Sequence, residues 1–194
     1  MKDLMTELRI SLAAVISLAI ILCGIYPLLV RICAQGFFPS QANGSLIMRS
    51  NKIVGSSLIS QGFIDSQYFH PRPSSAGQGY DPVASGGSNL GPISKKLVED
   101  VKQRVVDFRK ENRLPDNVPI PADAVTGSAS GLDPHISVKN ALLQAPRVAK
   151  IRGLSEKTVL AEIERYTEGR DLGFLGEPGV NVLILNMELD KILK

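Results

Sequence analysis

The chain has 194 residues, with 22 Lys and Arg against 19 Asp and Glu, a formal net charge of +3, and no Trp. So small and scattered an excess of basic residues argues against a nucleic-acid partner. The two cysteines, Cys23 and Cys33, lie near the N-terminus, which excludes a disulfide framework and a thiol nucleophile from the rest of the chain.

Residues 10–30 form an uncharged apolar run near the start of the chain. As a helix this run would extend roughly 31 Å, which matches the hydrocarbon core of a bilayer. A cleaved signal peptide would have a shorter apolar core followed by a small-residue cleavage site, whereas Arg31 follows this run directly. We therefore predict a short cytoplasmic tail at 1–9, a single transmembrane helix at 10–30 and a juxtamembrane linker at 31–44.

The charges that flank the apolar run give little information about its orientation. Lys2 and Arg9 lie on one side, and Arg31 and Arg49 lie at similar range on the other. The basic residues on the two sides are therefore nearly balanced, and the positive-inside rule does not select an orientation. A head of only nine residues is typical of a signal anchor whose N-terminus stays inside, so we expect the soluble domain to be extracytoplasmic.

Two small residues of the apolar run, Ala13 and Ser17, are one helical turn apart. Small residues at this spacing let a neighbouring helix approach closely in a membrane. We therefore predict that this face of the helix packs against a partner helix.

Residues 45–194 are long enough for one hydrophobic core, and their pattern mixes strands and helices. Because no regular alternation of strand and helix occurs, we predict an α+β domain rather than a doubly wound sheet. In chain order we expect a hairpin at 45–57, a Gly/Ser/Pro-rich loop at 73–92, an amphipathic helix at 93–112, a small-residue loop at 125–136, a helix from Ser137 to about Gln144, a helix at 156–167 and an apolar strand at 180–187.

The expected helix at 93–112 carries apolar residues on one face and charged residues on the other. That face consists of Leu97, Val98, Val101, Val105 and Phe108. A stripe of this kind usually faces the core, so we interpret it as structural.

Motifs of nucleotide hydrolases and serine hydrolases are missing from the sequence. It contains no G-x-x-x-x-G-K-[ST] motif, and in 127–131 (GSASG) the centre of a G-x-S-x-G pattern is Ala129. Ser130, Asp133 and His135 leave open a membrane-tethered Ser/His hydrolase, although a local turn at Asp133-Pro134 is the stronger interpretation. No spaced cluster of His, Cys or acidic residues indicates a metal site.

The two Gly/Ser loops carry the remaining candidate sites. Successive backbone N–H groups of such loops can hold an anion, which leaves open a tethered ligand-binding or sensor module. In the first loop, Ser85, Gly86, Gly87, Ser88 and Asn89 allow close approach of another backbone. Arg72, between two prolines, offers a stiff donor for a partner or a small anion.

Six blocks of sequence give the chain a resemblance to a known family. They are GSSLISQGF at 55–63, YFHPRPSSA at 68–76, SGGSNLGP at 85–92, GLDPHIS at 131–137, PRVAKIRGL at 146–154 and GFLGEPGVNVLILN at 173–186. In this order the blocks closely resemble the KdpC family, the small C subunits of bacterial Kdp potassium-transporting ATPases. The resemblance covers the apolar run and the whole domain.

The resemblance implies a non-catalytic accessory subunit of an ATP-driven potassium uptake complex in the bacterial inner membrane. Its implied partners are a channel-like potassium-translocating subunit, a P-type ATPase subunit and a small single-helix subunit. The family is regarded as an assembly factor and catalytic chaperone that raises ATP affinity, with no tightly bound cofactor other than a possible ATP. Carried onto this chain, the implied nucleotide-binding residues are Ser128, Ser130, Gly131, Asp133 and His135.

Overall fold

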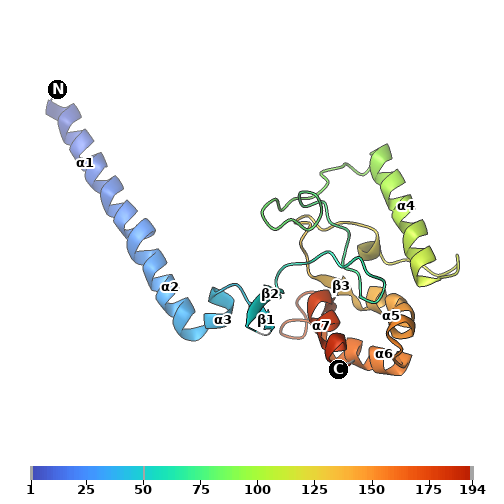
Figure 1. Cartoon of the computed structure of the whole chain (residues 1–194). Helices are drawn as coiled ribbons and strands as arrows, with labels where there is room; N and C mark the ends of the chain where they lie inside the picture. The colour runs from blue at the N-terminus through green and yellow to red at the C-terminus, as the bar shows by residue number, and fades with distance from the viewer. Residues whose placement is uncertain (1, 50, 193–194) are drawn as a thin grey trace. The chain divides into compact units, whose positions relative to one another are not determined.

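The structure is a computed structural model that describes residues 2–49 and 51–192. The chain divides into two compact units, and the boundary between them falls after Val54 in the sequence (Figure 1). The first unit is dominated by a long helix, which a short helix follows, and the second contains the helices after residue 94 and a three-stranded antiparallel sheet. The predicted α+β class, with one apolar N-terminal helix, is confirmed.

The N-terminal helix has three parts: α1 (Lys2–Ala19), a π-helical turn (Ile20–Ile25) and α2 (Tyr26–Phe37). In the turn, the backbone N–H of Tyr26 donates to Ile21 O, five residues back. Pro27 follows, which has no N–H and whose ring would clash with the carbonyl four residues earlier in a regular α-helix. The wider turn is a usual way to accommodate such a break, so the helix continues past Pro27.

This helix is long and apolar enough to cross a membrane over Leu4–Phe37, a stretch of 34 residues. At 1.5 Å per residue it extends about 51 Å, more than the hydrocarbon core alone requires. It continues into the segment that we predicted as a linker, and the short helix α3 (Pro39–Ala42) follows. Ala13 and Ser17 lie one turn apart in α1, and their contact with a partner helix stays a prediction.

The predicted hairpin is present as β1 (Leu46–Arg49) paired with β2 (Lys52–Ser56). Asn51, in the turn, has a positive φ of 64°, a conformation that Asn tolerates better than most residues. Ser50, within the predicted hairpin, lies outside the described residues.

The second unit places α5, α6 and α7 beside a three-stranded antiparallel sheet of order β3-β5-β4, and α4 contacts α5 (Figure 1). Its elements in chain order are α4 (Lys95–Asn112), a 3-10 turn (Ala122–Ala124), β3 (His135–Ser137), α5 (Val138–Arg152), α6 (Glu156–Arg165), β4 (Thr167–Glu168), β5 (Gly179–Asn181) and α7 (Val182–Ile192).

Serine caps fix the start of three helices. The side chains of Ser94, Ser137 and Ser155 accept hydrogen bonds from backbone N–H groups in the first turns of α4, α5 and α6. Each cap satisfies a donor that the helix itself cannot pair. The helix starts predicted at Ser137 and at residue 156 are confirmed.

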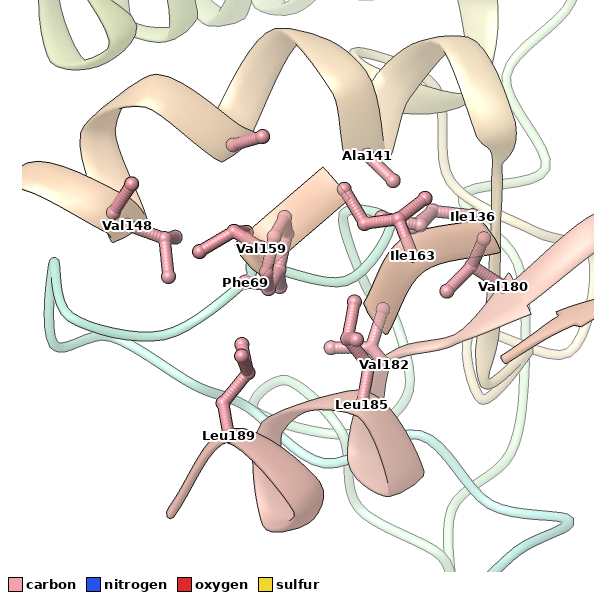
Figure 2. Packing of buried hydrophobic residues seen from close by; sticks show 12 residues of the cluster. Phe69, Ile136, Ala141, Val148, Val159, Ile163, Val180, Val182, Leu185 and Leu189 are labelled. Atoms are coloured by element: carbon pink, nitrogen blue, oxygen red, sulfur yellow. The ribbon is translucent and has the colours of Figure 1, made fainter. Parts of the chain in front are cut away.

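The core lies between α5, α6, α7 and the sheet, and Figure 2 shows Phe69 among the side chains of these helices. Phe69 is fully buried, although it comes from an extended segment that forms neither helix nor strand. Its neighbours are aliphatic, in agreement with the absence of Trp, and include Ile136, Val148, Val159, Ile163, Val180, Leu185 and Leu189.

Buried amide side chains replace the missing strand partner of this extended segment. Asn186 accepts from Phe69 N at 2.8 Å and donates to Phe69 O at 2.9 Å. Gln144 makes the same pair of bonds with His70, at 2.8 and 3.1 Å. Because a buried backbone group without a partner is costly, these two side chains let Phe69 enter the core.

Two expected elements are wrong in type or extent. The predicted strand at 180–187 ends at Asn181, and the rest is helix α7, which buries Val182, Leu185 and Leu189 on one face. An uninterrupted apolar run fits either structure, and the helical period becomes visible only when the run is extended to Leu189. The helix expected to end near Gln144 continues through Pro146 to Arg152, and Gly153 terminates it in the left-handed conformation.

The apolar face of α4 lies outside the central core and is only partly covered. Leu97, Val101, Val105 and Phe108 are half-buried, and Val98 is 44% exposed. The neighbouring face of the helix forms the wall of a surface groove.

Candidate functional site

Two loops that are far apart in the sequence are joined by hydrogen bonds in the second unit. We call residues 73–92 the glycine loop and residues 125–134 the serine loop. The carbonyl of Ser130 accepts from Gly86 N at 2.9 Å and from Ser85 Oγ at 3.0 Å. The segment predicted to contact a partner and the segment implied to bind nucleotide therefore form one surface.

Glycine is required where the two loops cross. Gly131 has a φ of +68°, which residues with a Cβ rarely adopt. A Cβ at this position would lie 2.8 Å from Ala76 N and 2.9 Å from Gly86 O, and both are backbone atoms that cannot turn away. A Cβ on Gly87 would approach Ala129 O to 3.1 Å. The loops are thus held at a distance that side chains would prevent.

The two loops and α4 enclose an open groove of about 710 Å³. From α4 it receives Leu97 together with Lys96, Asp100 and Arg104, which recur every four residues and so share one helix face. From the loops the groove is lined by small and polar residues: Ser75, Gly77, Gly87, Ser88, Asn89, Leu90, Thr126, Gly127, Ser128 and Ala129. Two cations and one carboxylate lie in a wall that otherwise offers hydroxyl, amide and backbone groups.

Arg72 does not line this groove but forms an internal ion pair. Its Nη1 lies 2.8 Å from Asp133 Oδ2, and its Nη2 donates to Gly127 O at 3.3 Å. The other carboxylate oxygen of Asp133 accepts from His135 N at 3.0 Å. Arg72 therefore ties the segment before the glycine loop to the serine loop.

Asp133 is held in its charged form by its neighbours. Its pKa falls to about 2, chiefly because of the His135 side chain, with smaller contributions from the His135 backbone N–H and Arg72 that together outweigh burial. The His135 Nδ1 lies 3.7 Å from Asp133 Oδ1, which is an electrostatic contact rather than a hydrogen bond. Because both oxygens are engaged, Asp133 is poorly placed to bind a phosphate or a metal ion.

The serine hydroxyls are not arranged for nucleophilic attack. Ser130 Oγ lies 3.2 Å from Ser128 Oγ and accepts from Leu132 N at 3.1 Å. His135 Nε2 instead faces Glu168 Oε2 at 3.1 Å. Over the described part of the chain, no hydrogen bond joins a serine hydroxyl to His135, so the geometry gives the hydrolase hypothesis no support.

The predicted site residues therefore divide into three groups. Gly87, Ser88, Asn89 and Ser128 line the groove. Another group joins the loops and consists of Ser85, Gly86, Ser130 and Gly131. The last is a polar chain that runs from Arg72 through Asp133 to His135. The sequence interpretation missed Lys96, Asp100 and Arg104, whose spacing was visible but which appeared to be an ordinary solvated helix face.

The side-chain contact of His135 in β3 with Glu168 in β4, the two strands on either side of β5, depends on pH. Asp133 contributes most to raising the pKa of His135, and Glu168 adds to it, whereas burial lowers it. A raised pKa means that the protonated form stabilises the folded state. This contribution is fully present below the unfolded pKa of about 6.5 and is lost as pH rises through the folded value.

We expect Glu168→Gln to lower the free energy of unfolding at pH 5.5 by less than about 1 kcal/mol, because the pair is partly exposed. The difference from the parent protein should shrink at pH 9, where His135 is neutral. Urea unfolding at both pH values measures this, with Glu164→Gln on the exposed face of α6 as control. An equal loss at both pH values would contradict protonation of His135 as the cause.

Comparison with known proteins places the chain in a family. A family model described as "KdpC: K+-transporting ATPase, c chain" matches residues 8–191. Similar proteins named potassium-transporting ATPase KdpC subunit occur in Mycobacterium tuberculosis (56% identical over 168 residues, 87% of this chain and 89% of the relative) and Nitratidesulfovibrio vulgaris (50% over 191 residues, 97% and 96%). Koribacter versatilis has another that is 47% identical over 189 residues, 97% of this chain and 94% of the relative.

These matches cover the apolar helix, both loops and the core, and they confirm the resemblance given by the six sequence blocks. This chain therefore belongs to the KdpC family, the non-catalytic c-chain subunits of the Kdp potassium-transporting ATPase complex.

Proposed function

We propose that this chain assists assembly of the potassium-transporting complex and raises the affinity of its P-type ATPase subunit for ATP, without turning over ATP itself. Its partners in this proposal are the channel-like potassium-translocating subunit, the P-type ATPase subunit and the small single-helix subunit. Family membership supports the assembly role, and the missing P-loop motif supports a role that is not hydrolytic.

The observation that carries the proposal is the groove between α4 and the two loops. The hydrogen bonds of Ser85 and Gly86 to the Ser130 carbonyl join the two loops that form it, while Ser88 and Ser128 line it. A surface that is ordered in advance loses little conformational entropy when a partner binds. We therefore assign the groove as the contact surface for an adjacent subunit of the complex.

A nucleotide in the same groove is the second candidate, because Lys96 and Arg104 face it together with the hydroxyls of Ser88 and Ser128. Cations and hydroxyl donors are the groups that hold phosphate. Equilibrium dialysis of the full chain in detergent with labelled ATP separates the candidates. Saturable binding that is lost in Lys96→Ala/Arg104→Ala favours the nucleotide, and no binding by the parent protein favours the subunit.

We propose further that the apolar helix spans the bacterial inner membrane once, with the N-terminus inside and the soluble domain outside. Membership of the KdpC family supports a single membrane anchor, and Ala13 and Ser17 supply the proposed packing face for a partner helix. An extracytoplasmic domain would lie away from ATP. Its effect on ATP affinity would then be transmitted through its partners.

We expect a cysteine at the exposed position Gln78, in a background with Cys23→Ala and Cys33→Ala, to be labelled by a membrane-impermeant thiol reagent in cells with permeable outer layers. The control is the same background without Gln78→Cys, which should stay unlabelled. Labelling that requires a broken inner membrane would place the domain inside and favour direct ATP binding.

A further inference from the structure

An exposed apolar cluster lies at the end of the hairpin that connects β4 with β5. Leu172 is 83% exposed, Phe174 69% and Leu175 49%. We call these three residues the apolar tip. Single exposed apolar residues are common on proteins, but three within four positions at one turn form a local patch that water solvates poorly.

The backbone of this hairpin is ordered by its own hydrogen bonds. Asp171 and Leu175 exchange N–H to carbonyl bonds in both directions, each of 2.9 Å. Leu172 has a φ of +53°, a left-handed conformation that is unfavourable for a residue with a Cβ. The chain thus holds Leu172 in a strained conformation at a place where burial of its side chain gives no compensation.

Ionic contacts stiffen the base of the hairpin. Arg170 Nη2 donates to both carboxylate oxygens of Glu177, at 2.9 and 3.0 Å, and Glu168 is held by His135 at 3.1 Å. Between Glu168 and Glu177 the sequence has three carboxylates, Glu168, Asp171 and Glu177, and one guanidinium, Arg170, so the hairpin carries a net negative charge. A tip that is fixed in this way requires little further ordering when a partner binds.

The charge of the hairpin selects between two kinds of partner. Segments that insert into a membrane surface normally combine apolar residues with Lys and Arg, because bilayer surfaces are anionic. Here the residues next to the apolar tip include three acidic side chains, Glu168, Asp171 and Glu177, and one basic side chain, Arg170. A protein socket with apolar walls and a cationic rim matches this arrangement better than lipid.

We propose that the apolar tip is a docking plug that enters such a socket on another subunit of the potassium-transporting complex. This inference rests on the proposed role of the chain as an assembly subunit. It adds a second contact, separate from the groove lined by α4. It also explains the strained conformation of Leu172, because burial of this side chain in a partner would compensate for the strain.

Photocross-linking in the assembled complex tests the docking plug. Phe174 is replaced by p-benzoylphenylalanine, and the matched control carries the same group at Ile64, which is 93% exposed. We expect irradiation to join Phe174 but not Ile64 to another subunit, and the cross-linked peptide to contain Lys or Arg beside apolar residues. The proposal would be overturned if Phe174 formed adducts only with lipid, with a second copy of this chain or within the chain. The absence of any cross-linked adduct would also overturn it.

A second variant measures the contribution of the apolar tip to binding. We expect Leu172→Ser/Phe174→Ser to reduce the amount of chain retained on the complex after a detergent wash at least tenfold relative to Ile64→Ser. Equal retention would overturn the proposal. If the control complex assembles and has normal ATP affinity while these results fail, only the docking plug is wrong; if the parent chain does not join the complex, the proposed function itself fails.

Discussion

Arg147→Met is expected to destabilise the soluble domain by about 3 kcal/mol, a large share of the total for a domain of this size. The Arg147 side chain is 5% exposed and anchors the segment that carries Phe69. It donates to Tyr68 O at 2.9 Å, to Ser66 O, and to the side chains of Asn112 and Gln144 at 2.9 and 2.8 Å. Methionine fills a similar volume but leaves these buried oxygens without their donor.

Urea unfolding of the full chain in detergent, followed by far-UV circular dichroism, measures the effect of Arg147→Met. Lys150→Met is the matched control, since Lys150 is exposed on the same helix α5. The control should unfold at the same urea concentration as the parent protein. If both variants unfold together, the hydrogen bonds of Arg147 do not hold the extended segment.

Gly131→Ala is expected to lower the free energy of unfolding by about 3 kcal/mol, because it combines a left-handed backbone with a Cβ that has no room. The Cβ would press on Ala76 N and Gly86 O, so the glycine loop would have to move away from the serine loop. We expect the groove beside α4 to open as a result. Protection of the Gly86 amide, which donates to Ser130 O, should fall in hydrogen exchange.

Gly86→Ala is the control for this substitution, because a Cβ at Gly86 would meet no atom within 4 Å. It should leave both the unfolding midpoint and the exchange of the loops unchanged. Equal stability of Gly131→Ala and Gly86→Ala would contradict the close crossing of the two loops.

Local signals in the sequence predicted the helix starts but not all the elements. Ser137 and Ser155 each precede a helical pattern, and a cap depends only on the residues that follow it, so both starts could be predicted. The end of α5 could not, because the cost of Pro146 inside the helix is offset by tertiary packing of Val148 and Ala149 in the core. In α7 the predicted strand at 180–187 is too short to show the helical period, because Leu189, the next buried position on the face of Val182 and Leu185, lies beyond it.

The candidate site was predictable only in pieces. The small residues around Ser88 and Ser128 indicated two candidate loops, because Gly and Ser permit close approach regardless of the fold. That Gly86 and Ser130 would meet depends on packing between distant segments, about which neither loop carries information. Lys96 and Arg104 were missed for the same reason: a charged helix face becomes part of a groove only when loops are placed opposite it.

The half-saturating ATP concentration of the assembled potassium-transporting complex tests the central claim most directly. Ser88→Trp fills the groove, whereas Val83→Trp places the same side chain on the glycine loop at a position that is 93% exposed and outside the groove lining. We expect Ser88→Trp to raise the KM for ATP about tenfold with kcat retained, which corresponds to about 1.4 kcal/mol of lost binding. Val83→Trp should match the parent complex. An unchanged KM in Ser88→Trp, with the chain still present in stoichiometric amount, would contradict the claim that this subunit raises ATP affinity through the groove.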